Sequence, residues 1–196
     1  MSWKDDQKFE KDWHNNCVNS YWEETKQMHY ARYMGLVAYQ TPDEKYPTYD
    51  LKGKSVLDIG GGAYSLLLKC VNLGKNSMVV DPLRYPSWTY ARYDAAGIGY
   101  ATIKGEDIEL KGFDEVWIYN CLQHTEDPEK IIQNARKAAK VIRIFEWIDR
   151  GVMLGHPQDL KKAKLDKWLG GKGKAEIFMI GNLNYGLCYS AVLNKF

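Results

Sequence analysis

Apolar residues recur at helical spacing near the start of the chain. Those spaced four apart are Phe9, Trp13, Cys17 and Tyr21. This period predicts one helix over residues 7–36, whose apolar stripe packs on the core. The next segment, 41–54, contains two prolines, turn-forming residues and charges, and it predicts a connector.

From residue 55 onward, short apolar runs alternate with helical patterns. The expected strands are SVLDI, SMVVD, GYATI, DEVWIYN and VIRIFEWI, and the expected helices are YSLLLKCV, SWTYARYDAA, a segment starting at Pro128, and PQDLKKAKLDKWLGG. Strands that are apolar at successive positions are typical of a parallel sheet with helices on both faces. The last two runs, AEIFMIG and LCYSAVL, are separated only by NLNYG, so we expect an antiparallel hairpin there.

The whole pattern predicts an α/β fold with a doubly wound, mostly parallel sheet and an N-terminal helical extension. A chain of 196 residues has room for one such domain. The formal net charge is +2 and the basic residues are spread along the chain, which disfavours a nucleic-acid partner. The N-terminus lacks the apolar core of a secretory signal, and no apolar run reaches the roughly 20 residues of a membrane span, so we expect a cytoplasmic protein.

Four cysteines are scattered along the chain, at Cys17, Cys70, Cys121 and Cys188. Their number and spacing do not suit a disulfide framework, and we interpret them as small buried apolar residues. His14 with Cys17 and Cys121 with His124 could supply four zinc ligands, but neither pair has the CxxC spacing of a zinc knuckle. We therefore expect no metal site.

A glycine-rich turn follows the first expected strand, in the stretch SVLDIGGGAY. Gly60, Gly61 and Gly62 allow a tight turn and a close approach of the backbone to a ligand. A dinucleotide-binding turn would carry a third glycine at Ser65 and would place a pyrophosphate beside Asp58. That carboxylate repels a pyrophosphate but attracts a ligand with a cationic ammonium and sulfonium, such as S-adenosylmethionine.

The same stretch resembles the first motif of the class I S-adenosylmethionine-dependent methyltransferases, which is an acid followed by GxGxG. Asp58, Gly60 and Gly62 match this motif, and Tyr64 stands in place of the third glycine. The resemblance implies that Asp58 holds the methionyl amino group, directly or through water. It also implies that the glycine turn lies against the amino acid portion and the sugar of the cofactor.

Acidic residues follow the second and third expected strands. Asp81, next to Pro82, could accept both ribose hydroxyls or, alternatively, cap the helix that starts near Ser87. The stretch IKGEDIEL resembles the family's adenine-binding segment, which implies that an acidic side chain takes the exocyclic amine and that the next apolar residue packs on the ring. The residues that fit these roles are Glu106 or Asp107, with Ile108.

The segment after the fourth expected strand, FDEVWIYNCLQHTEDPEKIIQNARK, resembles that of a small-molecule branch with quinone C-methyltransferases and sugar and natural-product O-methyltransferases. The matching positions are Phe113, Asp114, Asn120, Leu122, His124, Asp127 and Pro128. This resemblance implies a methyltransferase domain over residues 41–196, with seven strands in the order 3-2-1-4-5-7-6 and one of them antiparallel. It also places Asn120 at the cofactor.

Methyl transfer needs an aligned acceptor, a dry pocket and, where the acceptor loses a proton, a base. His124 lies just past the fourth strand and is either that base or a helix-start residue bonded to nearby backbone. Glu146 and His156, at and after the end of the fifth strand, are further candidates for the base. We also expect the aromatic segment 1–40 to form a lid, through Tyr21, Trp22, Tyr30 and Tyr33.

The predicted function is transfer of a methyl group from S-adenosylmethionine to a small-molecule acceptor, with oxygen as the favoured acceptor atom and S-adenosylhomocysteine as product. The alternatives are an S-adenosylmethionine-binding protein without methylation activity, a nucleic-acid methyltransferase and a nicotinamide oxidoreductase. NCLQ stands where a nucleic-acid methyltransferase would carry an NPPY-type tetrapeptide, and Asp58 and Ser65 oppose the oxidoreductase.

Overall fold

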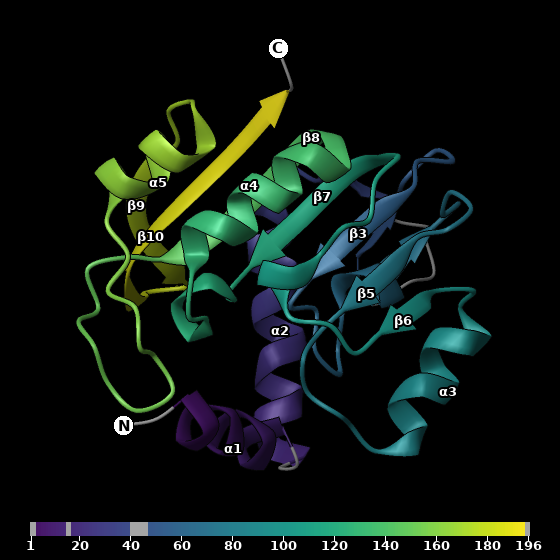
Figure 1. Ribbon diagram of the computed structural model, residues 1–196, viewed down its shortest axis with the longest axis horizontal. Coiled ribbons are helices and arrows are strands. Elements are labelled where there is room, and N and C mark those ends of the chain that lie inside the picture. The colour runs from purple at the N-terminus through teal and green to yellow at the C-terminus, as the bar shows by residue number, and fades with distance from the viewer. Residues whose placement is uncertain (1–2, 15–16, 40–46, 195–196) are drawn as a thin grey trace.

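A seven-stranded sheet crosses the middle of the molecule, with helices on both of its faces (Figure 1). The computed structural model describes residues 3–14, 17–39 and 47–194, and the side chains of residues 17–21 and 24 lie outside this description. In spatial order the strands are β6 (Gly99–Ala101), β5 (Met78–Val80), β3 (Val56–Ile59), β7 (Phe113–Tyr119), β8 (Ala139–Trp147), β10 (Leu183–Asn194) and β9 (Lys174–Ile180).

The order and direction of the strands confirm the predicted fold class. Numbered along the chain, the strands of this sheet lie in the order 3-2-1-4-5-7-6. The pairs from β6 to β8 are all parallel, whereas β10 pairs antiparallel with both β8 and β9. The one antiparallel strand is therefore β10, the second strand of the predicted hairpin.

Side chains of β7 fill the core on both faces of the sheet, because successive residues of a strand point to opposite sides. Val116 and Ile118 pack in the core with residues of α4 (Pro128–Ala138) and α5 (Lys162–Leu169). Trp117 and Tyr119 pack in a second core with residues of α2 (Cys17–Tyr33), η1 (Leu66–Lys69) and α3 (Ser87–Ala95). This two-sided burial explains the continuous apolar run of the sequence.

Helix α4 begins where the sequence predicts. Asp127 Oδ1 accepts a hydrogen bond from the backbone N–H of Lys130 at 3.0 Å, and Pro128 is the first helical residue. Helix α5 ends at Gly170, whose φ of +67° is the left-handed conformation that a C-terminal glycine cap adopts without strain.

The prediction of one N-terminal helix over residues 7–36 is wrong. Helix α1 (Trp3–His14) ends before α2 begins at Cys17. Asn15 and Asn16 lie between the two helices in the sequence, and asparagine has low helix propensity.

The two members of the predicted apolar stripe that lie in α1 are not buried in the core, and the side chains of the other two, Cys17 and Tyr21, lie outside the described residues. Phe9 and Trp13 of α1 are 39% and 38% exposed, respectively. The apolar residues that are buried against the sheet come from the second half of α2 and the turn after it, and they are Tyr30, Ala31 and Met34.

Two further segments differ from their predictions because strands pair there. Part of the expected connector 41–54 is β2 (Thr48–Asp50), which pairs with β1 (Ala38–Tyr39) and β4 (Cys70–Val71) in a second, small sheet. Strand β4 takes the end of YSLLLKCV, so the helix predicted there is reduced to the single turn η1. Pairing between distant segments outweighs local helix propensity at this point.

The hairpin turn between β9 and β10 is shorter than predicted. Only residues 181 and 182 separate the two strands, and the rest of NLNYG lies in β10, where the register shifts between Asn184 and Gly186.

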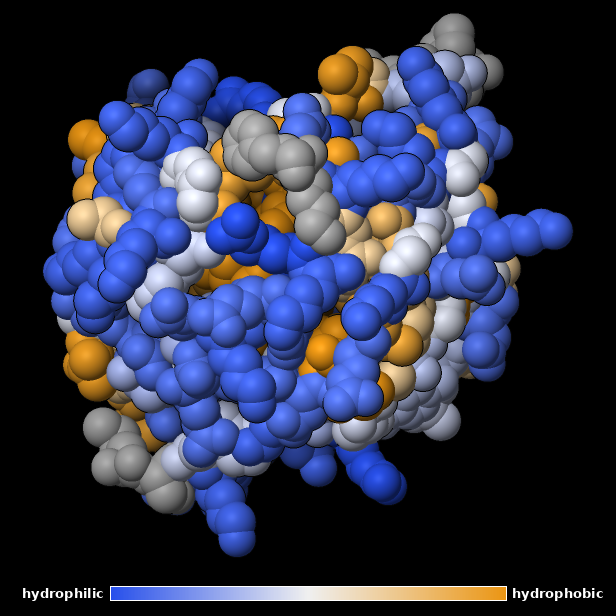
Figure 2. All heavy atoms as spheres, turned by 45° about the horizontal axis from the view of Figure 1, so that its top comes forward, coloured by the Kyte–Doolittle hydropathy of each residue, from blue (hydrophilic) through white to orange (hydrophobic). Residues whose placement is uncertain are grey.

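The face in Figure 2 is mostly hydrophilic, with apolar side chains visible between the polar ones. No helix in the described part of the chain has the length and apolar character needed to cross a bilayer.

Candidate functional site

A cavity lies at the carboxyl ends of β3, β5 and β7, which is where open α/β sheets bind their ligands. Of the predicted cofactor residues, those that line it are Gly60, Gly61, Gly62, Asp81, Pro82, Glu106 and Asn120. Helices α1 and α2 cover this end of the sheet (Figure 1) and line the cavity with Trp3, Gln7, Glu10, Trp13, His14, Glu23, Gln27 and Tyr30.

Two glycines of the turn, Gly60 and Gly61, are packed so closely that a side chain has no room there. Gly60 has φ +76°, and a Cβ there would lie 2.3 Å from Cys121 Sγ. A Cβ on Gly61 would lie 2.5 Å from a carboxylate oxygen of Asp58. At Gly62, with φ +63°, the nearest atom to a Cβ would be the Tyr85 hydroxyl at 3.5 Å. Gly62 lines the cavity, and its lack of a side chain leaves this part of the cavity open.

Asp58 lies beneath this turn and does not line the cavity. Its side chain is fully buried and accepts hydrogen bonds from the hydroxyls of Ser65 and Tyr119, at 2.5 and 2.6 Å. Burial raises the pKa of Asp58 to about 7, although these two hydrogen bonds act against the shift. The structure therefore places Asp58 as a support of the glycine turn, only partly ionised at neutral pH, and not in direct reach of a ligand.

Asp81 is the carboxylate at the end of β5 that does line the cavity. Its Oδ1 accepts hydrogen bonds from the backbone N–H of Leu83 at 2.8 Å and from the Tyr85 hydroxyl at 3.4 Å. The alternative that Asp81 caps α3 is wrong, because Pro86 occupies the cap position and no side chain bonds there. Burial raises the pKa of Asp81 to about 6, so the group is mostly ionised at pH 7.

The structure separates the three candidates for the adenine site. Glu106 lines the cavity, and its Oε1 accepts hydrogen bonds from the backbone N–H groups of Glu126 and Asp127, both at 3.1 Å. Asp107 is exposed and points away, and Ile108 is buried in the core beneath α4. Of the two acids, Glu106 is therefore the one that lines the cavity.

The residues after β7 form the opposite wall. Asn120 has φ +51°, a conformation rare outside glycine, and its Oδ1 accepts a hydrogen bond from Gln123 Nε2 at 3.0 Å. Glu146, at the end of β8, is fully buried below this wall, and its Oε1 accepts hydrogen bonds from the backbone N–H groups of Cys121 and Leu122. Burial raises the pKa of Glu146 to about 7. Glu146 thus positions the wall without lining the cavity.

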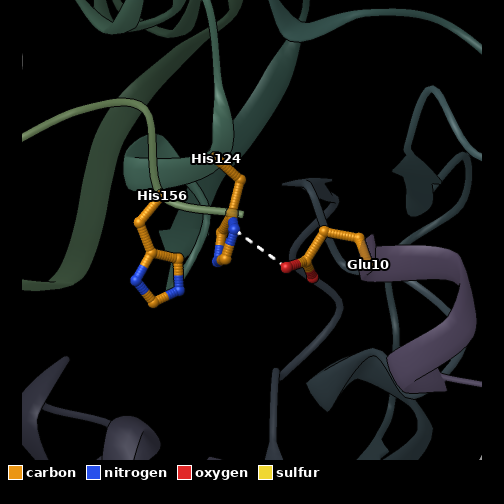
Figure 3. Close-up of side chains that lie close together, drawn as sticks. All are labelled: Glu10, His124 and His156. Atoms are coloured by element: carbon orange, nitrogen blue, oxygen red, sulfur yellow. Dashed lines mark ion pairs between the residues drawn. The ribbon is translucent and has the colours of Figure 1, made fainter. Parts of the chain in front are cut away.

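His124, in η3 (Leu122–His124), meets Glu10 of α1 and His156 of the loop after β8 (Figure 3). Its Nδ1 lies 3.1 Å from the Glu10 carboxylate and 2.6 Å from the carbonyl oxygen of Gly155. Burial lowers the pKa of His124, but the charge of Glu10 and the hydrogen bonds outweigh it and raise the pKa. Burial and the neighbouring His124 lower the pKa of His156 to about 4, so this ring is neutral at pH 7.

No protein-family model matches this sequence, and no curated protein matches it. Solved structures do resemble its fold. The magnesium protoporphyrin IX methyltransferase ChlM from Synechocystis PCC 6803, with bound S-adenosylmethionine, matches with a TM-score of 0.60 and 16% identity, over 96% of this chain and 97% of that chain.

Two further structures extend the likeness. A chain in the complex between the Haloferax volcanii Trm112 methyltransferase activator and a methyltransferase has a TM-score of 0.66 and 10% identity, over 95% of this chain and 97% of that chain. The N-methyltransferase NodS from Bradyrhizobium japonicum WM9, in complex with S-adenosylhomocysteine, has a TM-score of 0.54 and 18% identity, over 72% and 78%. The chain therefore shares the fold of these methyltransferase structures.

Among the described aromatic side chains that were predicted to form a lid, only that of Tyr30 lines the cavity. Tyr30 is also buried in the core, whereas Tyr33 packs on Phe145 and Phe178. The side chain of Trp22 is 48% exposed, and that of Tyr21 lies outside the described residues.

The polar residues that α1 brings to the cavity were not among the predicted site residues. Gln7, Glu10 and His14 are spaced three and four positions apart and so share one face of the helix. That spacing was the available signal. The zinc alternative is not assessed by the structure, because the Cys17 side chain lies outside the description, while Cys121 packs against Gly60.

Proposed function

We propose that the cavity binds S-adenosylmethionine and that the protein transfers its methyl group to a small-molecule acceptor, with oxygen as the acceptor atom. The observation that carries this proposal is the position of the cavity. A side-chain-free glycine turn faces the carboxylate of Asp81 across neighbouring strand ends, in a fold shared with ChlM and NodS, whose structures hold S-adenosylmethionine and S-adenosylhomocysteine.

The residues present fit this cofactor. Gly62 leaves space for the amino acid portion, Asp81 offers a carboxylate to the ribose hydroxyls, and Glu106 offers one to the adenine amine. Asn120 adds an amide beside them. When bound, the cofactor supplies an electrophilic methyl group on a sulfonium.

Charge also favours a cationic ligand over a pyrophosphate, although not through Asp58 as the sequence suggested. The carboxylates that line the cavity are Glu10, Glu23, Asp81 and Glu106. Lys104 is the one lysine or arginine among the described lining residues, and its Nζ is bonded to Glu126. An acidic wall of this kind attracts a sulfonium and repels the phosphates of a nicotinamide dinucleotide.

The side chains around the cavity have separate tasks in this proposal. Helices α1 and α2 exclude water, which strengthens the interactions inside. His124 lies on the wall and assists the loss of a proton from an acceptor hydroxyl. Glu146 holds the backbone next to His124, and His156 packs edge-on against its ring, with ring centroids 4.6 Å apart.

Calorimetric titration with S-adenosylmethionine, S-adenosylhomocysteine and NADH tests the binding step. We expect both adenosyl ligands to bind and NADH to show no binding. Transfer of a radiolabelled methyl group to fractions of a metabolite pool then tests the reaction. Binding without any labelled product would support a cofactor-binding protein without methylation activity, and NADH binding in place of the adenosyl ligands would contradict the proposal outright.

A further inference from the structure

Three side chains that suit metal ligation converge beside the cavity. Glu10 comes from α1, His124 from η3, and His156 from the loop between β8 and α5 (Figure 3). One ligand atom from each lies within 4.8 Å of the other two. The three residues are far apart in the sequence, so only the fold brings them together.

We propose that Glu10, His124 and His156 form a binding site for one divalent transition-metal ion of the zinc class. Two imidazoles and one carboxylate are a ligand set that zinc, cobalt and iron(II) accept, with the remaining positions open to water or substrate. The ion would occupy the space between the Glu10 carboxylate and the two rings. This assignment departs from the expectation of no metal site drawn from the sequence.

The distances suit a site that closes slightly on binding. Ligand atoms of a tetrahedral zinc ion, at about 2.1 Å from the metal, are about 3.4 Å from one another. The carboxylate of Glu10 and Nδ1 of His124 are already 3.1 Å apart. His156 lies on a loop, so a small movement of its side chain brings the third ligand into range.

The hydrogen bonds of the cluster show where a proton lies in the metal-free protein. Both neighbours of His124 Nδ1, the Glu10 carboxylate and the Gly155 carbonyl, are acceptors, so this nitrogen carries a proton in the metal-free protein. His156 Nδ1 is buried and has no hydrogen-bond partner in the described structure. The ring of His156 turns its other nitrogen, Nε2, toward Glu10 and His124 (Figure 3), so an ion between the three side chains replaces the shared proton and meets His156 through Nε2.

The surroundings are acidic enough to hold a cation. Asp6 Oδ1 accepts a hydrogen bond from the backbone N–H of Gly155 at 2.8 Å, next to His156, and Glu146 lies below His124. Arg150 is the cation whose charge acts on His156. The carboxylates of Glu10 and Asp6 outnumber it and compensate the charge of the ion.

The ion would have two consequences for the cavity. It fastens α1 to the body of the fold, because Glu10 is its ligand from that helix. Glu10 and His124 also line the cavity, so the open positions of the ion face the acceptor. This second consequence rests on the proposed function. The ion would favour acceptors with a hydroxyl group that can ligate it, because a metal-bound hydroxyl loses a proton more easily.

Cobalt titration of the untagged chain, after treatment with a chelator, tests the site. Calorimetry and the visible absorption of bound Co²⁺ are expected to show one ion per chain. Glu10→Gln and His156→Ala should each weaken binding at least about tenfold. His29→Ala is the matched control, since His29 lies on α2 against Phe178, and it should leave the affinity unchanged.

Two outcomes would overturn the site: no Co²⁺ binding by the wild type, or an affinity that stays within twofold in both Glu10→Gln and His156→Ala. Thermal unfolding of each variant shows that it is folded before its affinity is compared. S-adenosylhomocysteine binding is measured on the same samples, so the two proposals fail separately. A wild type that binds S-adenosylhomocysteine but not cobalt removes the metal site alone, and a wild type that binds cobalt but not S-adenosylhomocysteine removes the proposed function alone.

Discussion

At the scale of single residues, Gly60 shows two constraints that can be separated by experiment. Gly60 and Gly97 both have positive φ, +76° and +67°. A Cβ on Gly60 meets Cys121 Sγ at 2.3 Å, whereas a Cβ on Gly97 meets nothing within 4 Å. The pair therefore distinguishes the cost of the conformation from the cost of the contact.

We expect Gly97→Ala to lower the free energy of unfolding by about 1 kcal/mol, through its left-handed conformation alone. Gly60→Ala should cost a further 2 kcal/mol or so, because the added methyl group overpacks the turn against Cys121. Urea denaturation followed by tryptophan fluorescence measures both. Equal losses for the two variants would show that the contact with Cys121 is not tight.

We expect Asp81 to set a pH dependence for cofactor binding. Its pKa is about 6, and only the ionised carboxylate accepts both ribose hydroxyls, so affinity for S-adenosylhomocysteine should fall as pH drops through 6. Asp81→Asn should weaken binding about tenfold or more at pH 7.5 and remove this pH dependence. Asp107→Asn, on an exposed acid outside the cavity, is the control and should bind normally. A wild-type affinity that is flat between pH 5 and 7.5 would contradict the role of Asp81.

How far the site could be predicted from the sequence depends on the kind of residue. Gly62, Asp81 and Asn120 stand at strand ends, and strand ends can be read from apolar runs, so their place in the cavity was predictable. Asp58 also ends a strand, yet its side chain turns under Gly61, and no pattern in one sequence reports that direction. Glu10 comes to the site only through the packing of α1 on the loops, which is a tertiary contact.

At the scale of elements, α1 and α2 differ in what they contribute. Asp6 is the one buried residue in α1, whereas the end of α2 and the turn after it place Tyr30, Ala31 and Met34 in the core. Removing residues 1–40 would therefore damage the core and the cavity together. A shorter deletion separates the two.

A chain that starts at Cys17 tests α1 by itself. We expect its thermal midpoint to change little, because α1 buries few apolar groups, and its affinity for S-adenosylhomocysteine to fall about tenfold, because the cavity loses one wall. Calorimetry measures both quantities. Full affinity in the folded, shortened chain would refute the role of α1 as a cover.

Elements with strong local signals were predictable, and those decided by pairing were not. Asp127 and Pro128 mark the start of α4 by their own chemistry. YSLLLKCV carries a helical pattern as well, but its last residues form β4 because β2 lies beside them. β2 comes from a segment rich in proline and charge, so the competing partner could not be read from local sequence.

At the scale of the whole molecule, strand order was predictable from the resemblance and the hairpin, because connections in such sheets follow few topologies. The hydrogen bonds that connect the N-terminal helices to the sheet could not be predicted from the sequence. They are made by Arg143 of β8, which donates to Glu115 of β7 and to the carbonyl oxygen of Met34 after α2. Lys54 and Trp117 also donate to Glu115, so one buried carboxylate joins β7, β8 and the segment before β3, and through Arg143 it reaches the turn after α2.

This carboxylate should govern stability in acid. Burial alone would raise the pKa of Glu115, but the hydrogen bonds from Arg143, Lys54 and Trp117 lower it to about 2, against 4.5 for an ordinary glutamate. A folded-state pKa below the unfolded one stabilises the fold above pH 4.5, and this contribution is lost as pH falls from 4.5 toward 2. The difference corresponds to about 3 kcal/mol.

Glu115→Gln should accordingly lower the free energy of unfolding by about 2 to 3 kcal/mol at pH 7, because it leaves Arg143 with an uncharged partner in a buried place. The gap between wild type and variant should narrow as pH falls from 4.5 toward 2, since Glu115 of the unfolded wild type then takes up a proton while the folded carboxylate stays ionised. Urea denaturation at pH 7, 4 and 3 measures this gap, with Glu109→Gln, on an exposed acid, as the control. A gap that stays constant over this range would mean that the Glu115 charge does not hold the helices to the sheet.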